Sequence, residues 1–336
     1  MIEQHFKKLH NMKQLFLLFI FFAAFPSLLL AQQDTLSYNV AIPKPAVIKL
    51  IKTPEALGIS EKVQKRNSTL NNPTTNIALF AVDRRSTDIQ GNSDVIMIIS
   101  IDPVTKKIKM SSLLRDTYVN IESQGKDKLN SAFATGGPQL AIKTINQNFE
   151  LDIKDYINVD FFSAAKIVDA LGGVNINVKP AELPILNNYL YEISLIEKIP
   201  SIPLTSAGLQ KLNGKQTVAY TRIRAVGRGD YERTERQRTV LVSLFSKMQG
   251  AGPDIFPVFM NEILPNLETS MSSMTLFTIG SNILNSKTKV IEQARFPLDS
   301  ASKGERINNI WYLNTDLKAT SASIYNFIYK NIQPGK

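Results

Sequence analysis

The sequence of 336 residues contains no cysteine, which excludes disulfide bonds, thiol catalysis and cysteine-ligated zinc sites. Histidine is almost as scarce: the only two are His5 and His10, both ahead of a long apolar stretch near the amino terminus. The rest of the sequence therefore offers no histidine as a general base or as a metal ligand. A metal ion would have to be bound by oxygen atoms, which favours Mg²⁺, Mn²⁺ or Ca²⁺.

Composition predicts a globular, basic protein. Hydrophobic residues make up 43% of the chain and charged residues 20%, enough for a packed core. The formal net charge is +10, and residues 1–31 contribute only three lysines and one glutamate to it. The remainder is therefore basic by itself. Such a surface suits nucleic acid, anionic lipid or an anionic substrate, and charge alone does not choose among these.

Residues 15–31 form an apolar stretch, LFLLFIFFAAFPSLLLA, that follows Lys13. A basic start before an apolar stretch is typical of an export signal. Its length also reaches the lower limit of roughly 17 residues for a membrane span. Cleavage after Ala31 and retention as an anchor both stay open, with a slight preference for an anchor because Leu29 replaces the usual small residue. We expect the rest of the chain to lie outside the cytoplasmic membrane, in the cell envelope.

Strands and helices alternate along the remaining sequence. Short apolar runs and amphipathic stretches predict strands and helices. Strands are predicted at 77–82, 95–101, 107–114, 174–178 and 290–296, and helices at 138–149, 161–171, 232–248 and after residue 316. The apolar, proline-containing residues 180–205 predict a loop or lid, and Thr205 is expected to cap a short helix ending at Asn213-Gly214. The alternation predicts an α/β fold, an α-β-α sandwich with a central mixed β-sheet.

Changes in composition also predict the domain organisation. After the export or anchor segment, 1–31, the polar and proline-dotted residues 32–72 are typical of a stalk. Residues 73–250 carry the alternating strands and helices and are expected to form the catalytic core. Residues 251–336 are expected to be a C-terminal extension packed on the same domain.

Charged residues follow or precede three of the predicted strands. Asp83 and Arg85 follow the first strand, Asp94 precedes the second, and Arg115 with Asp116 closes the third. Ligand sites in α/β folds gather at such strand ends. Aspartates there could hold Mg²⁺, and arginines could bind phosphate oxygens in bidentate fashion. Taken singly, these residues are also compatible with ordinary surface ion pairs.

A second group of charges is concentrated between residues 222 and 238, where six arginines fall within seventeen residues and lysine is absent. Arg222 and Arg224 follow an expected strand and would share one face of it. Arg233 and Gln237 are four apart on the predicted helix 232–248, so they project from the same side. A solvated basic face is the alternative, but such faces usually contain more lysine. The pattern favours an anion-binding site.

Four sequence segments resemble the motifs of the LytR–CpsA–Psr family, in the family order. The matching segments are Ser111–Val119, Lys128–Phe133 with Gly136-Gly137, Val168–Val174, and Leu212–Gln216 continuing through Arg222–Arg224 to Arg236-Gln237. They resemble the family's Ser-x-Pro-Arg-Asp, Lys-Ile-Asn-x-Ala, Asp-x-Leu-Gly-Gly-Val and long arginine-rich motifs. Three positions depart from the family pattern: Asn92 stands where many members have arginine, Leu114 replaces proline, and Val95 replaces threonine.

The resemblance implies an Mg²⁺-dependent phosphotransferase (Mn²⁺ being the second choice) that moves a glycopolymer, such as teichoic acid or capsule, from a polyprenyl-pyrophosphate carrier to peptidoglycan. Asp83 and Asp94 would bind the metal ion. The residues implied for pyrophosphate binding are Arg85, Arg115, Lys128, Arg222, Arg224, Arg233 and Gln237. Catalytic roles are expected for Arg115, Asp116, Arg224 and Asp230. Pyrophosphatase activity is an expected side reaction, and Asn92 removes one phosphate contact.

The reaction would be phosphoryl transfer, in which an acceptor hydroxyl attacks the phosphorus on the sugar side. In the absence of histidine, Asp94, Asp116 and Asp230 are the candidates for the base, without a ranking among them. Residues 180–205 and helix 232–248 are expected to wall a pocket for the carrier's tail.

Two other functions are compatible with the sequence. A non-catalytic binder of polyprenyl phosphate or glycopolymer would use the same residues. A transcriptional attenuator would suit the basic charge, but the export segment and the lack of a recognition helix argue against it. The expected partners are therefore a polyprenyl-pyrophosphate-linked glycan, peptidoglycan and the membrane surface, and not nucleic acid.

Overall fold

The computed structural model describes residues 46–69, 74–82, 91–284 and 290–335, all of which belong to one compact unit. The predicted export segment 15–31 lies outside the described residues, and so do Asp83 and Arg85. In the described ranges, no helix is long and apolar enough to cross a membrane.

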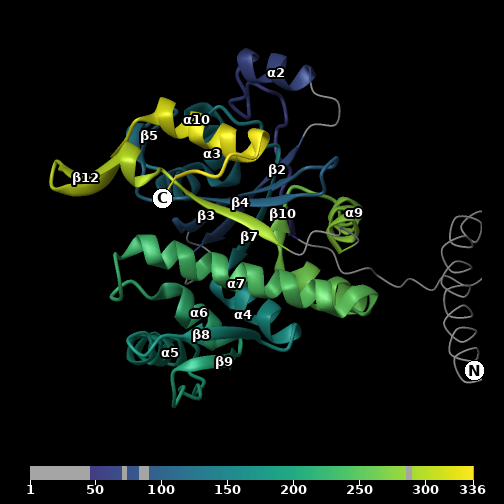
Figure 1. Cartoon of the computed structure of the whole chain (residues 1–336), viewed down its shortest axis with the longest axis vertical. Coiled ribbons are helices and arrows are strands. Elements are labelled where there is room, and N and C mark those ends of the chain that lie inside the picture. The colour runs from purple at the N-terminus through teal and green to yellow at the C-terminus, as the bar shows by residue number, and fades with distance from the viewer. Residues whose placement is uncertain (1–45, 70–73, 83–90, 285–289, 336) are drawn as a thin grey trace, which may run out of the picture. The chain divides into compact units, whose positions relative to one another are not determined.

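A mixed sheet of seven strands forms the centre of this unit (Figure 1). Its strands, in spatial order, are β1 (Ala46–Val47), β10 (Glu268–Thr269), β7 (Asp155–Asp160), β2 (Thr75–Val82), β3 (Ser93–Ile101), β4 (Ile108–Leu113) and β11 (Ile291–Phe296). β2, β3 and β4 are antiparallel neighbours, whereas β7 runs parallel to β2 and β11 parallel to β4. The central mixed sheet predicted from the sequence is confirmed.

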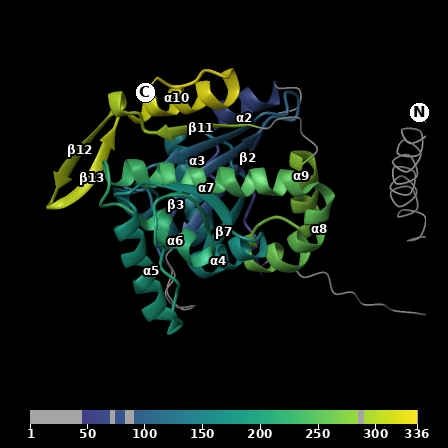
Figure 2. The same ribbon diagram turned by 60° about the horizontal axis from the view of Figure 1, so that its bottom comes forward.

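The sheet is buried on both faces, and this explains the almost continuous apolar runs of its middle strands. Ile96 and Ile98 of β3 point to one face and Met97 between them to the other. The first face is covered by α2 (Glu61–Ser68), α3 (Ser131–Phe149) and α10 (Leu317–Lys330). The second face is covered by α7 (Asp230–Ala251) and α9 (Ser273–Leu284), with α8 (Ile255–Val258) nearby (Figure 2).

A second, smaller core lies on the far side of α7 from the sheet (Figure 1). Its elements are α4 (Phe161–Ala170), α5 (Leu183–Glu197), α6 (Gly214–Arg222) and the hairpin β8 (Val174–Val178) with β9 (Gly208–Leu212). Val240 of α7 packs into this core, while Leu241 and Phe245 pack on the sheet. The apolar positions of α7 that were expected to wall a tail pocket thus contact protein on both sides.

Three expectations about local structure were wrong. Residues 180–205 are not a loop throughout, because α5 occupies Leu183–Glu197. Its proline, Pro184, stands in the first turn, where a missing N–H costs nothing. Thr205 caps no helix, since the chain continues into β9. Asn213 instead caps α6, with Gln216 completing a capping box, so Arg222 ends a helix and not a strand.

The amino-terminal boundary of the domain also differs from the expected stalk at 32–72. Leu57, Ile59 and Val63 are buried in the core of the α3 face. Ser60 caps α2 by accepting a hydrogen bond from the Val63 amide. These three apolar side chains hold an otherwise polar segment against the core, so the folded domain begins before residue 73.

Two small hairpins complete the fold beside the carboxyl end of β4. They are β5 (Tyr118–Ile121) with β6 (Gly125–Lys128), and β12 (Ser302–Ile307) with β13 (Ile310–Thr315). The rings of Tyr118 and Tyr312 lie 4.6 Å apart and join the hairpins. The Leu313 amide donates to the carbonyl of Asp116, so the hairpins hold the turn that follows β4.

Candidate active site

Asp94 is the centre of a group of charged side chains at one end of the sheet. Because β3 and β4 are antiparallel, the start of β3, with Asp94, lies beside the end of β4, where Arg115 follows. Arg115 Nη1 lies 2.6 Å from Asp94 Oδ1. The amino-terminal turn of α7 brings Arg233, whose Nη2 lies 2.8 Å from Asp94 Oδ2. Two arginines from distant segments therefore share one carboxylate.

A second carboxylate, Asp230, joins the same arginines from the first residue of α7. Arg115 Nη2 lies 3.3 Å from Asp230 Oδ2. Arg224, in the turn before α7, places Nε 3.4 Å from Asp230 Oδ1 and Nη2 3.5 Å from Asp94 Oδ2. The structure thus brings together the predicted residues Asp94, Arg115, Arg224, Asp230 and Arg233.

Asp116 and Lys128 border this group on the side of the small hairpins. Lys128 Nζ lies 2.7 Å from Asp116 Oδ1, and Arg115 Nε lies 3.6 Å from Asp116 Oδ2. We call the seven residues the Asp94 cluster: Asp94, Arg115, Asp116, Lys128, Arg224, Asp230 and Arg233. The cluster contains four cations and three carboxylates, which leaves a net positive charge for an anion.

The three carboxyl groups of the cluster differ in proton affinity. Burial alone would raise the pKa of Asp94, but Arg233 and Arg115 outweigh burial and hold that pKa below its ordinary value. Burial and a hydrogen bond with Asp230 raise the pKa of Asp116 in spite of Lys128 and Arg115. The pKa of Asp230 is lowered, because Arg115 and its other partners outweigh burial. Asp116 is therefore the most basic of the three.

Arg233, which contacts Asp94, and Gln237 each carry a buried polar atom without a hydrogen-bond partner in the described part of the chain. These atoms are Arg233 Nε and Gln237 Oε1, both on the same side of α7. Arg233 and Gln237 are almost completely buried, so water does not freely compensate for the missing hydrogen bonds. An unpaired donor and acceptor next to a positively charged cluster are typical of a site that awaits a polar ligand.

Arg222 lies apart from the cluster. Its Nη2 lies 3.3 Å from Glu192 Oε2, and its guanidinium stacks on the ring of Tyr189 at 4.8 Å. Arg222 and Arg224 point in different directions because α6 ends at Arg222 and the chain turns at Ile223. The expectation of a shared strand face is wrong, and Arg222 contacts α5 instead.

Only half of the predicted metal pair can be placed. Asp94 lies in the cluster, whereas Asp83 and the predicted phosphate ligand Arg85 lie outside the described residues. Among the residues that are described, no group of three or more aspartate, glutamate or histidine side chains is placed so that it could hold a metal ion. Of the predicted pair, the described part of the chain thus supplies one carboxylate, Asp94, which the guanidinium groups of Arg115, Arg224 and Arg233 already contact.

Arg236, three residues after Arg233, belongs to a separate assembly. Its Nε lies 2.8 Å from Glu182 Oε1, and its other nitrogens donate to the carbonyls of Ile223 and Val226. Both side chains of this pair are almost fully buried. The pair fixes the turn that carries Arg224. The sequence analysis missed Glu182, which stands just before α5 in the segment expected to be a loop.

Arg238, the last arginine of the segment 222–238, is partly buried against β4. Its Nη1 donates to Ser112 Oγ at 3.1 Å. Burial lowers the pKa of Arg238 to about 10, and nearby Arg295 adds to the shift. Ser112 is a polar residue in a buried strand, and this was the signal that a polar partner faces it.

The motif glycines of the smaller core have a structural role. A Cβ on Gly214 would lie 2.1 Å from the carbonyl oxygen of Ala165, and one on Gly173 would lie 2.6 Å from that of Leu212. The Gly214 amide donates to Asp169 Oδ1 at 2.7 Å. Two segments that resemble family motifs thus contact each other and position α6.

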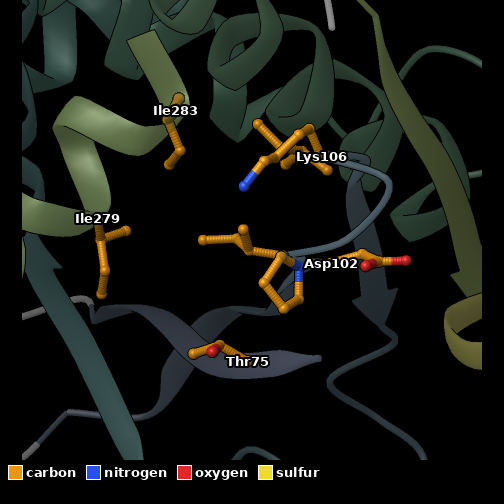
Figure 3. Close-up of a pocket in the computed structure, with 8 residues that line it drawn as sticks. Thr75, Asp102, Lys106, Ile279 and Ile283 are labelled. Atoms are coloured by element: carbon orange, nitrogen blue, oxygen red, sulfur yellow. The ribbon is translucent and has the colours of Figure 1, made fainter. Parts of the chain in front are cut away.

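A pocket of mostly apolar lining lies at the opposite ends of the strands (Figure 3). Its wall consists of Thr75, Ile101, Asp102, Pro103, Lys106, Ile108, Ile279 and Ile283. Asp94 and Ile101 lie seven residues apart on β3, which corresponds to roughly 23 Å at 3.3 Å per residue. The pocket therefore does not border the Asp94 cluster.

Comparison with known proteins agrees with the resemblance of the motifs. The chain is 32% identical over 250 residues to the polyisoprenyl-teichoic acid–peptidoglycan teichoic acid transferase TagU of Oceanobacillus iheyensis, and the match covers 70% of each chain. The structure of TagT bound to LI-WTA superposes with a TM-score of 0.64 at 21% identity, over 84% of this chain and 99% of that one.

The structure of the LytR-CPS2A-psr family protein YwtF (TagT) with bound octaprenyl pyrophosphate lipid superposes with a TM-score of 0.61 at 20% identity and the same coverage. At such identities the two structures establish the common fold. The model of the LytR_cpsA_psr family matches residues 46–327. This match spans most of the chain and includes the whole Asp94 cluster, so the protein belongs to the LytR_cpsA_psr family.

Proposed function

We propose that this protein transfers a glycopolymer from a polyprenyl-pyrophosphate carrier to peptidoglycan. The observation that carries the proposal is the Asp94 cluster, in which Arg115, Arg224 and Arg233 converge beside the unpaired Arg233 Nε and Gln237 Oε1. Planar guanidinium groups match the oxygen geometry of a pyrophosphate. The TagU relative is named a teichoic acid transferase, which agrees in substrate class.

In the proposed reaction, an acceptor hydroxyl of peptidoglycan attacks the phosphorus nearest the sugar. A new P–O bond forms, the bridging P–O bond of the pyrophosphate breaks, and polyprenyl phosphate leaves. Arg224, which is partly exposed, and Arg115 would bind phosphate oxygens and stabilise the charge that develops on them. Before substrate binds, the carboxylates of the cluster hold the arginines in place. The phosphate oxygens would then compete with these carboxylates for the arginine N–H groups.

Asp116 is our first choice for the group that takes the hydroxyl proton. A base must be ionised at the working pH yet hold a proton well, and Asp116 has a raised pKa while Asp94 and Asp230 have lowered ones. The hydrogen bond between Asp116 and Asp230 gives the proton a second acceptor. This ranks candidates that the sequence alone left equal.

We further propose that Mg²⁺ takes part, held by Asp94 and Asp83. An ionised carboxylate has about four lone-pair sites, so Asp94 can hold a hard cation while Arg115 and Arg233 remain bound. The charge count fits as well, because four cations against three carboxylates fall short of neutralising a pyrophosphate. Bound Mg²⁺ would supply charge neutralisation of the phosphate oxygens. Mn²⁺ is the alternative, and pyrophosphate hydrolysis with water as acceptor is the proposed side reaction.

The proposed place of action is the cell envelope, outside the cytoplasmic membrane. The support is the apolar segment 15–31 after Lys13. A fusion of a reporter to Lys336 tests this, because a reporter active only in the cytoplasm would stay silent if the proposal holds.

The transferase is tested by reconstitution with a polyprenyl-pyrophosphate-linked glycan and peptidoglycan fragments. We expect release of polyprenyl phosphate and a glycan–peptidoglycan product, both abolished by chelation and restored by Mg²⁺. Tight binding of the carrier without either product would support the non-catalytic binder instead. Unchanged turnover after chelation would remove the metal from the proposal and leave the transfer reaction standing.

A further inference from the structure

The carboxyl-terminal half of α5 and the loop after it expose an unusual number of large apolar side chains. Five of them are exposed by 49% to 78%: Tyr191, Leu195, Ile196, Ile199 and Ile202. We call these five residues the α5 apolar patch. Leu209, at the start of β9 just beyond the loop, is also 75% exposed. Contiguous exposed apolar residues mark sites of protein or membrane contact.

Hydrogen bonds hold the loop that displays the patch. The side chain of Asn187 accepts from the Leu204 amide and donates to the Leu204 carbonyl, both at 2.9 Å. Gln216 Nε2 donates to the carbonyl of Ile202 at 2.9 Å. The backbone is therefore anchored to α5 and α6, while the Ile199 and Ile202 side chains stay in solvent. Such exposure is a property of the folded structure and not of a frayed end.

Two lysines without an ion-pair partner in the described structure lie next to exposed apolar residues of this region. The two acidic residues of α5 are both paired, Glu192 with Arg222 and Glu197 with Lys215. Lys198, next to Ile199, and Lys211, two residues after Leu209, are exposed and have no ion-pair partner among the described residues. Apolar side chains flanked by unpaired lysines match the boundary between acyl chains and anionic headgroups.

The patch lies on, and just after, the helix that Arg222 contacts. Glu192 lies between Tyr191 and Leu195 along α5, and its partner Arg222 is two residues from Arg224 of the Asp94 cluster. α5 extends away from the central sheet, and Figure 2 shows it projecting beyond α6 and α4. A lipid-linked substrate resides in a bilayer, so a patch that contacts the bilayer would hold the domain close to its substrate.

We propose that the α5 apolar patch docks the protein on an anionic lipid bilayer, an inference that rests on the proposed function for its purpose but not for its test. A second copy of the chain is a poorer occupant. A symmetric contact through the patch would bring unpaired lysines toward each other, whereas anionic headgroups neutralise them. Tyr191 suits the role, since tyrosine is enriched where apolar and aqueous phases meet.

The absence of cysteine allows a direct test on the full chain. Ile202→Cys introduces a single thiol for an environment-sensitive fluorophore, and Val104→Cys, at the turn between β3 and β4, provides a control of similar exposure. The labelled chains are reconstituted in vesicles of phosphatidylethanolamine and phosphatidylglycerol that contain a nitroxide-labelled lipid. We expect blue-shifted, quenched emission at position 202 and neither effect at position 104. Equal quenching at both positions would overturn the proposal.

Two further measurements separate other occupants and the function itself. A blue shift at position 202 that grows with protein density but is not quenched by lipid would assign the patch to a second copy and overturn docking. The double variant Ile199→Glu/Ile202→Glu should lower turnover of a long-chain, vesicle-embedded carrier by about tenfold or more. It should leave turnover of a short, water-soluble carrier unchanged, and Val104→Glu should change neither. Absence of all turnover would refute the transferase while the fluorescence still decides docking.

Discussion

Two arginine–carboxylate assemblies lie three residues apart on α7, and they differ in how completely they are satisfied. Each of the three guanidinium nitrogens of buried Arg236 donates a hydrogen bond, one to a carboxylate and two to backbone carbonyls. Around Arg233, carboxylates are shared among several cations, Arg233 Nε has no partner in the described structure, and Arg224 remains partly exposed.

The difference separates a structural ion pair from a binding site. In the Glu182–Arg236 pair, which we call closed, every guanidinium nitrogen has a partner within the protein. Such an assembly gains nothing from a ligand, and it fixes the turn between α6 and α7. The open Asp94 cluster keeps like charges close together, and the pKa of Arg224 is lowered by burial, Arg233 and Arg115. An anion would relieve that repulsion. Removal of an arginine should therefore cost stability in the first assembly and activity in the second.

The largest expected effect is on stability, in Arg236→Ala. The substitution leaves Glu182 buried without its partner, which costs about 3–5 kcal/mol. Chemical denaturation of the variant and the parent measures this loss. Arg233→Ala is the matched control, since it relieves repulsion as well as breaking contacts, and less than half of that loss is expected. Equal losses in the two variants would end the distinction between closed and open assemblies.

The next effect concerns the proposed base. Asp116→Asn should lower turnover by roughly a hundredfold, the lower range for loss of a general base. In the parent, turnover should fall as pH drops through the raised pKa of Asp116, which lies above the ordinary value of 3.8, because only the ionised carboxyl accepts a proton. The residual activity of the variant should lack this acidic limb. A limb that persists in Asp116→Asn would transfer the role to Asp230.

A smaller effect is expected at Arg224, which contributes charge and geometry without taking a proton. Charge-assisted contacts are worth about 1.5–3 kcal/mol, so Arg224→Ala should lower turnover by roughly ten- to a hundredfold. Arg224→Lys keeps the charge but loses the planar fork, and should recover only part of the loss. If Arg224→Lys restores full turnover, the positive charge at this position is sufficient and the planar shape of the guanidinium is not required. Steady-state kinetics at fixed ionic strength distinguish the two.

The smallest effect is expected at Arg228, which belongs to neither assembly. It is the most exposed of the α7-associated arginines and contacts Glu232 and Asp299 at the surface. Surface ion pairs contribute little, so turnover of Arg228→Ala should stay within about twofold of the parent. Arg238 would not serve as this control, because its guanidinium donates a hydrogen bond to Ser112 of β4. A loss of turnover comparable to that of Arg224→Ala would mean that Arg228 also takes part in binding the substrate.

Local pattern in the sequence determined most secondary structure and the family. The helix expected at 232–248 is α7, and the strands expected at 77–82, 95–101 and 174–178 are β2, β3 and β8. Apolar runs and helical periodicity depend on neighbours within a few residues, so the sequence alone predicts the elements that they form. The same logic located the arginine-rich segment and four motifs.

Only the tertiary structure decided which arginine does what. Arg222, Arg224, Arg233 and Arg236 look alike in sequence, yet they reach Glu192, Asp230, Asp94 and Glu182 respectively. These partners are spread over α5, α7 and β3, and Asp94 is 139 residues away from Arg233. Whether all N–H groups of a guanidinium find partners within the protein depends on what else is packed around it. That packing is set by long-range contacts of the sheet and the smaller core, and no local pattern encodes it.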